Sequence, residues 1–190
     1  MDVEVIYPGG DLVLCSKRTG TVQGRFLVSS TFLGNVSPVF RAMFSGRYAE
    51  GQALSSITPP DINLVGPSNT NTVRILLKLV HLSHKDLPRS LDVETLLDLV
   101  GIANQYDCIS AIRPVHKMWM FRARQTEPGY FGFLGLIETA FVLSDREDFR
   151  HWTGTFVMQN DERFTDAQLV HVPSDTMRRS ITGNLSTTLG

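Results

Sequence analysis

The chain has few cysteines, no long apolar run and no excess of either charge. Its 190 residues include 2 cysteines, Cys15 and Cys108, and neither has another cysteine or a histidine at metal-ligand spacing. Such sparse cysteine usage is typical of a reduced intracellular protein, in which thiols behave as small core side chains. Because no stretch resembles a secretory signal or a transmembrane helix, we expect a cytoplasmic or nuclear location and no membrane binding.

The charges are balanced, with Lys+Arg 18 against Asp+Glu 19 and a net charge of -1. A balanced chain has no electrostatic drive toward a phosphate backbone, so we expect no nucleic-acid partner. The one local basic cluster is Lys117, Arg122 and Arg124, which lies among apolar residues. We interpret it as a solvated helix face beside a core face.

Residues that could support catalysis or metal binding are present, but they do not form a complete set at a standard spacing. His81 and His84 are three apart with Asp86 nearby, so two imidazoles could share one helix face. A usable zinc site needs three or four protein ligands, and we therefore interpret this segment as a helix end running into a polar loop. The sequence predicts no metal, no cofactor and no enzymatic activity, with a small hydrolase as a remote alternative.

The first third of the chain has strand character. The β-rich ranges 3–7 and 11–15 flank Pro8-Gly9-Gly10, which predicts a hairpin or paired strands. Extended character resumes at 23–28. The range 55–64 contains Pro59-Pro60, so it allows only a short edge strand beside the prolines.

Helical spacing begins at Thr31. Ser37-Pro38 separates two short helices, because serine caps a helix and proline is tolerated at its first position. Ser45-Gly46 ends the second helix, and 47–53 is predicted to be a polar loop. Apolar residues then recur at helical spacing from Val73 to Val80, with further apolar positions that predict a helix buried on most sides.

The rest of the chain is predicted to be helical. Asp92 is a candidate N-cap for the next helix. The range 110–123 is a helix opened or kinked by Pro114, with an inner side formed by Val115, Met118 and Trp119. Glu127-Pro128-Gly129 separates this module from a tail of two helices, the second starting at a Ser144/Glu147 capping box. A last short helix is possible within 174–183, followed by a flexible end at 184–190.

Two segments carry a specific resemblance. Phe26-Leu27-Val28-Ser29-Ser30, followed by the range 37–46, closely resembles the signature of BTB/POZ domains, and Leu76 to His81 looks like the next helix of that family. The helix ending in Gln105-Tyr106-Asp107-Cys108 is similar to the variety common in fungi. The resemblance covers the first two thirds of the chain strongly and the tail more weakly.

The resemblance implies an α+β fold in which helical hairpins pack on a small mixed sheet, with a BTB/POZ domain at 1–125 and a helical extension at 126–190. It also implies a protein-interaction module that forms a homodimer and recruits other proteins. The alternative is a substrate adaptor of a cullin-RING ubiquitin ligase, with a cullin scaffold as partner. The candidate interaction residues are Asp11, Phe32, Val39, Phe40, Arg41, Met43, Phe44 and Tyr48.

One departure from the family concerns Asp11. Members that recruit corepressors usually carry a His-Arg or His-Lys pair after the third strand, and its cation faces the strand aspartate. This chain has Ser29-Ser30 at that place. Asp11 is therefore expected to act as a turn or cap residue.

Overall fold

The computed structural model describes residues 2–18, 20–64, 69–83, 86–126 and 128–159. Within these ranges the chain is α+β, with a four-stranded mixed sheet and nine helices. It divides into two compact units, the first ending at Ala123 and the second beginning at Arg124. The sequence places the boundary between residues 125 and 126, close to this division.

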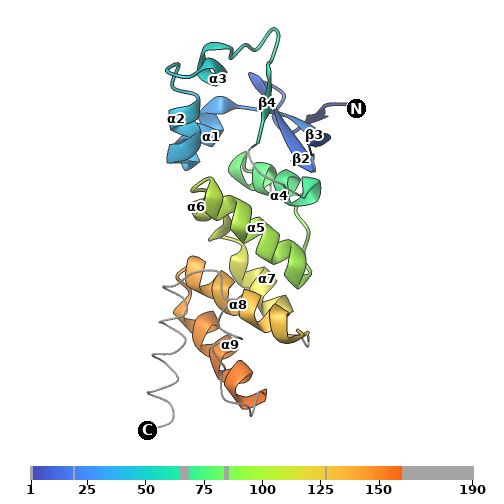
Figure 1. Cartoon of the computed structure of the whole chain (residues 1–190), viewed down its shortest axis with the longest axis vertical. Coiled ribbons are helices and arrows are strands. Elements are labelled where there is room, and N and C mark those ends of the chain that lie inside the picture. The colour runs from blue at the N-terminus through green and yellow to red at the C-terminus, as the bar shows by residue number, and fades with distance from the viewer. Residues whose placement is uncertain (1, 19, 65–68, 84–85, 127, 160–190) are drawn as a thin grey trace. The chain divides into compact units, whose positions relative to one another are not determined.

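The sheet belongs to the first unit and has the strand order β1-β3-β2-β4 (Figure 1). β2 (Leu12–Arg18) and β3 (Thr21–Val28) form an antiparallel hairpin. β1 (Glu4–Val5) pairs with β3 in parallel, and β4 (Asp61–Asn63) pairs with β2 in parallel. The short edge strand predicted beside Pro59-Pro60 is confirmed as β4.

The predicted pairing of the first two strands is wrong, because β1 and β2 lie on opposite sides of β3. The turn between them crosses the end of β3 closely. A Cβ atom added to Gly10 would lie 2.7 Å from the carbonyl oxygen of Val28, so only glycine fits at this crossing. The turn therefore carries the chain past β3 instead of folding it back on β1.

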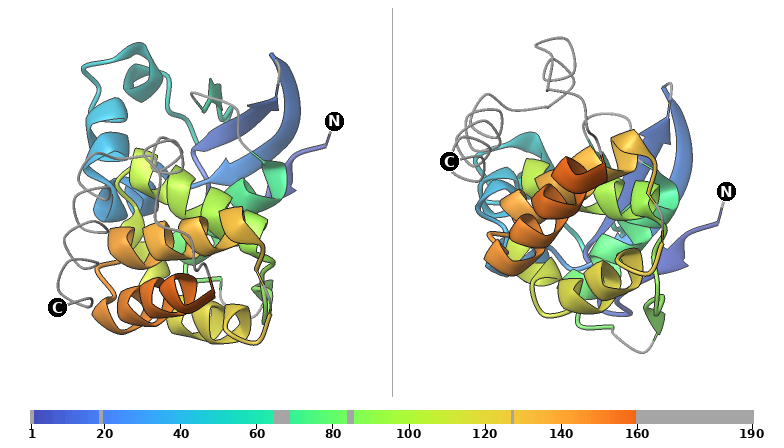
Figure 2. Two further views of the ribbon diagram at one scale, coloured as in Figure 1. Left: turned by 60° about the horizontal axis from the view of Figure 1, so that its bottom comes forward. Right: turned by 90° about the horizontal axis from the view of Figure 1, so that it is seen from below.

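Three short helices follow the hairpin and lie on the side opposite the N-terminus in both views of Figure 2. α1 (Ser30–Val36) and α2 (Pro38–Met43) meet at Ser37, as predicted, and Gly46 with a φ of 76° follows the end of α2. α3 (Ala49–Gln52) lies within the range predicted to be a loop, so that prediction was wrong. A helix of four residues is too short to show a periodic pattern in the sequence.

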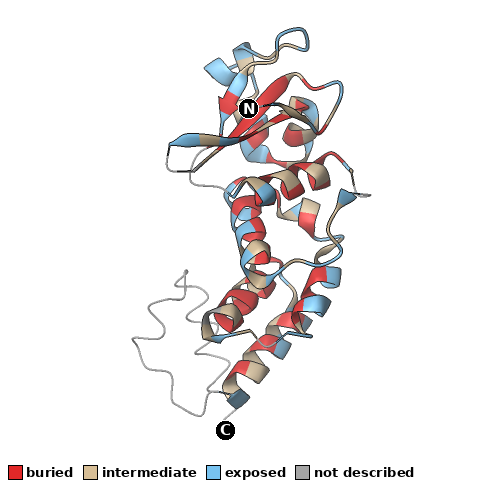
Figure 3. Cartoon of the chain, turned by 90° about the vertical axis from the view of Figure 1, so that its right-hand side faces the viewer, coloured by how far each residue is buried: buried red, intermediate tan, exposed pale blue. Residues whose placement is uncertain are grey.

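α4 (Thr70–Val80) is the central helix of the first unit and contacts β2, β3, α1, α5 and α6. Its burial on most sides is confirmed, since Thr72, Val73, Ile75, Leu76, Leu77, Leu79 and Val80 are all buried. Figure 3 shows in red the buried residues along the helices and strands. The predicted N-cap of α5 (Val93–Gln105) is also confirmed, because the Asp92 carboxylate accepts the backbone N–H of Thr95 at 2.8 Å. That hydrogen bond lowers the pKa of Asp92.

The chain around Pro114 forms two helices, α6 (Ile109–Ile112) and α7 (His116–Ala123). Trp119 is fully buried, as predicted, and its indole N–H donates to the carbonyl oxygen of Pro88 at 3.0 Å. Met118 was predicted to face inward but is 42% exposed. The buried side of α7 is formed by Trp119, Met120 and Ala123, which leaves Met118 on the outer side.

The second unit contains the helical hairpin α8 (Tyr130–Val142) and α9 (Arg146–Gln159). Aromatic rings pair across this hairpin. The ring centroid of Phe133 lies 5.8 Å from that of Trp152 and 6.0 Å from that of Phe156. No described helix combines the length and apolar character needed to cross a bilayer. The helix and flexible end predicted within 174–190 lie outside the described residues.

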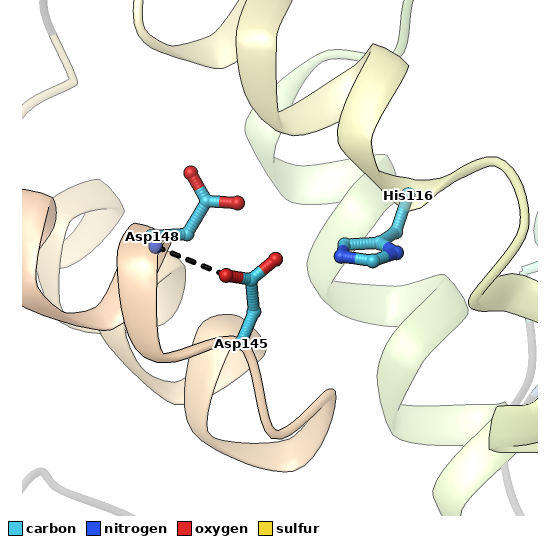
Figure 4. Close-up of side chains that lie close together, drawn as sticks. All are labelled: His116, Asp145 and Asp148. Atoms are coloured by element: carbon cyan, nitrogen blue, oxygen red, sulfur yellow. Dashed lines mark hydrogen bonds between the residues drawn. The ribbon is translucent and has the colours of Figure 1, made fainter.

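The predicted capping box at the start of α9 is wrong by one residue. Ser144 has a φ of 57°, which suits the residue that follows a helix, and it ends α8. Asp145 is the cap instead: its carboxylate accepts the backbone N–H groups of Glu147 at 3.1 Å and Asp148 at 3.2 Å, the latter drawn in Figure 4. An aspartate caps as well as a serine, so the sequence did not distinguish the two.

Candidate functional site

Two surfaces of the first unit together contain four of the eight candidate residues. The first, which we call the α2–β4 surface, is the solvent-facing part of the segment from α2 to β4, where Val39, Arg41, Tyr48 and Ile57 are exposed. The second is the β1–α1 surface, defined by Val5 and Phe32. Each surface is built on buried contacts that fix its backbone.

α2 is fixed at its N-terminal end by Ser37, which is fully buried. The hydroxyl of Ser37 accepts the backbone N–H of Phe40 at 2.9 Å and donates to the carbonyl oxygen of Tyr106 at the end of α5. The ring of Phe40 stacks on that of Tyr106, with centroids 4.7 Å apart, and on that of Phe44 at 5.7 Å. One hydroxyl and one ring stack therefore join α2 to α5 and set which side of α2 faces outward.

The outward side of this region is apolar. Val39 is 38% exposed, Tyr48 is 57% exposed and Ile57 is 94% exposed. Ile57 occupies a loop ordered by Ser55, whose hydroxyl oxygen accepts the backbone N–H groups of Ile57 at 3.3 Å and Thr58 at 3.1 Å. A hydrophobic side chain held in solvent by an ordered loop is available to a partner's pocket.

Arg41 has a structural task on the same surface. Its guanidinium donates to the carbonyl oxygens of Gly34 at 2.8 Å and Asn35 at 3.5 Å. These carbonyls lie in the last turn of α1, where backbone acceptors need donors. Arg41 therefore ties α2 to α1, and its exposed position lets it also border a partner.

Asp11 anchors the start of α1. Its carboxylate accepts the backbone N–H of Ser30 at 2.7 Å and the hydroxyl of the same residue at 2.6 Å. Ser30 is the first residue of α1, so Asp11 caps the helix from a distant part of the chain. The interpretation of Asp11 as a cap residue is confirmed.

Phe32 lies next to this anchor. Its ring is 5.2 Å from that of Tyr7 and 5.3 Å from the imidazole of His81. On the neighbouring edge strand, Val5 is 56% exposed. Val5 comes two residues before Tyr7, so the β1–α1 surface combines an exposed aliphatic side chain with a partly buried aromatic cluster.

The structure separates the eight candidate residues by burial. Phe40 is 2% exposed and belongs to the core, whereas Phe32, Met43 and Phe44 are half-buried. Val39, Arg41 and Tyr48 are exposed, and Asp11 is half-buried. The sequence analysis missed Val5, Ile57 and His81. For His81 a signal was present, because it follows the buried Leu77 by four positions and so continues the inner face of α4.

His81 has no free ring nitrogen for a metal. Nδ1 lies 2.8 Å from the carbonyl oxygen of Leu77, and Nε2 accepts the backbone N–H of Ser29 at 3.0 Å. The predicted polar loop thus begins with a buried residue, since His81 is 8% exposed. His84, its possible companion, lies outside the described residues.

The two cysteines are buried thiols. Burial raises the pKa of Cys15, and it raises the pKa of Cys108 to about 11. A thiol nucleophile needs a lowered pKa to form the thiolate near neutral pH. Both environments therefore favour the unreactive protonated form.

An ion pair with a buried carboxylate lies in the described part of the second unit. The guanidinium of Arg124 donates to the carboxylate of Asp148, which is 1% exposed, and Nε of Arg124 lies 2.9 Å from Asp148 Oδ1. Arg124 also reaches Glu147 at 3.3 Å. Because Arg124 lies at the start of the unit and Asp148 in α9, this pair fastens the entering chain to the hairpin.

No model of a known protein family matches the chain. No curated protein matches it either.

Proposed function

We propose that the chain is a protein-interaction module of the BTB/POZ type that pairs with a second copy of itself and recruits a further protein. The order of elements supports this proposal: a β-hairpin, a helix pair, a short edge strand parallel to β2, and then successive helices. The two segments that resemble the BTB/POZ signature contribute the end of β3 and α2, on either side of α1. Within the second of these segments, Ser37 has a structural role, because its hydroxyl joins α2 to α5.

The observation that carries the pairing is the exposed edge strand β1. Val5 is 56% exposed there, and β1 is held firmly because Glu4 accepts a hydrogen bond from Arg74 on α4 at 2.7 Å. The Arg74 guanidinium also lies 5.6 Å above the ring of Phe26. A fixed edge strand with an apolar side chain offers both backbone groups and buried area to another chain. Two copies meeting by the same surface form a closed dimer, in which each Val5 is buried.

Light scattering over a concentration series tests the pairing in the full chain. We expect the mass to rise from one copy to two and then to remain constant. Val5→Lys places a charge on the edge strand and should shift the transition to higher concentration. Thr21→Lys, at the exposed start of β3, is the matched control and should pair like the unchanged protein. A mass of one copy at every concentration rejects the pairing.

A second candidate is a substrate adaptor of a cullin-RING ubiquitin ligase. It is favoured by the α2–β4 surface, where Tyr48 and Ile57 are both apolar and exposed. A pull-down with a purified cullin scaffold tests it. Ile57→Asp should abolish capture, while the neighbouring exposed Ser56→Ala should retain it. If the unchanged protein captures no scaffold, this candidate is rejected and the pairing stands on its own evidence.

A further inference from the structure

The imidazole of His81 joins α4 to the start of α1. Its two hydrogen bonds define its protonation, because the backbone N–H of Ser29 can only donate and so Nε2 must carry a lone pair. The proton is on Nδ1, which donates to the carbonyl oxygen of Leu77 at 2.8 Å. The contact between α4 and the N-cap residue of α1 therefore requires a neutral ring with its proton on Nδ1.

The surroundings of the ring resist a second proton. Tyr7 and Phe32 lie against it, with centroids at 5.9 Å and 5.3 Å. The helix α1 carries no titratable side chain, and on α4 the ionisable groups are Arg74 and Lys78, both cationic. Neither of these two helices carries a carboxylate that could offset the desolvation of a charged imidazole.

Two other titratable groups lie on the segments that meet here. One is the phenol of Tyr7, whose ring packs against the imidazole. The carboxylate of Asp11 is engaged by both donors of Ser30. The C-terminal end of α4 favours a cation, but burial outweighs this effect and lowers the pKa of His81 below 6.5. The ring is therefore neutral near pH 7.

We infer that His81 is a proton-operated latch on the start of α1. A proton added to Nε2 would compete with the N–H of Ser29 for the same lone pair, so the hydrogen bond would break and two N–H donors would face each other. The N-terminal turn of α1 would then separate from α4 and move Phe32. Because Phe32 belongs to the β1–α1 surface, the latch regulates the pairing proposed above and rests on it for its biological effect.

The latch is tested by nitrogen-15 NMR of the full chain during an acid titration. We expect the amide resonance of Ser29 and the ring nitrogens of His81 to shift together, with one midpoint below 6.5. His81→Gln keeps a side-chain donor and acceptor but does not titrate, so the Ser29 shift should disappear. His116→Gln, on α7, is the matched control and should retain it.

An unchanged Ser29 resonance while the His81 ring titrates would overturn the latch. This measurement is made on the unchanged protein and needs no variant to fold. Light scattering at the same pH values separates the latch from the pairing. If the dimer dissociates at the pH where His81 titrates, the latch regulates the pairing. If the protein is a monomer at every pH, only the proposed pairing is rejected, because the Ser29 resonance decides the latch by itself.

Discussion

Replacing Ser37 with alanine should destabilise the first unit substantially. The change removes a helix cap, which is worth about 1 kcal/mol. It also leaves the buried carbonyl oxygen of Tyr106 without its hydroxyl donor, which costs about 1–3 kcal/mol. The thiol of Cys108 contacts the same oxygen at 3.5 Å and satisfies it weakly, so the lower half of that range applies. We expect a total loss of about 2–3 kcal/mol in the free energy of unfolding.

Urea unfolding measures this loss if the signal comes from the correct unit. The chain has two tryptophans, Trp119 in the first unit and Trp152 in the second. In a Trp152→Phe background, fluorescence therefore follows the first unit alone. Ser45→Ala is the matched control, because its hydroxyl donates to the Ala42 carbonyl oxygen at an exposed site, and its effect should stay within about 0.5 kcal/mol. A Ser37→Ala loss as small as that of the control would refute the reasoning.

Three further predictions concern buried ionisable groups. Arg124→Met removes the guanidinium from Asp148, which is 1% exposed, and should lower the free energy of unfolding by about 3–5 kcal/mol. Urea unfolding followed by the fluorescence of Trp152 measures this loss, and the exposed Arg146→Met should be nearly neutral. Burial raises the pKa of Glu138, so its charged form is penalised in the folded state. Glu138→Gln should therefore raise the free energy of unfolding at neutral pH. Equal stability of the two proteins at neutral pH would contradict this. That gain should shrink as the pH falls through the raised folded-state pKa of Glu138 toward 4.5, and it should be absent at lower pH, where both states are protonated. Cys108, with a pKa of about 11, should react with iodoacetamide only after unfolding, and stoichiometric labelling of the native chain would instead revive a nucleophilic function.

Local signals in the sequence predicted the elements that are stabilised locally. The period of α4, the Asp92 cap and the Ser37-Pro38 junction all depend on residues within a few positions of one another. The partner of β1 could not be predicted in this way. It is set by the passage of Gly10 across the end of β3, a contact between segments far apart in the chain.

The candidate surfaces were predictable only in part, for the same reason. Val39 and Phe40 are adjacent, apolar and both in α2, so composition cannot say which one faces the core. The ring of Tyr106, far along the chain, selects Phe40 by stacking on it. His81 was mistaken for a loop residue because its buried partner, the N–H of Ser29, is equally distant in sequence.

The same contacts that decide burial also prepare the surfaces for binding. Because Ser37 and Phe40 fix α2, Val39 is presented to solvent on a backbone that loses little freedom when a partner arrives. Ser55 acts in the same way for Ile57 by holding two amides of its loop. Removing a side chain that orders the backbone should therefore weaken the binding of any partner to the α2–β4 surface, even when the exposed side chain is unchanged. We expect Ser55→Ala to reduce such binding although Ile57 itself is intact.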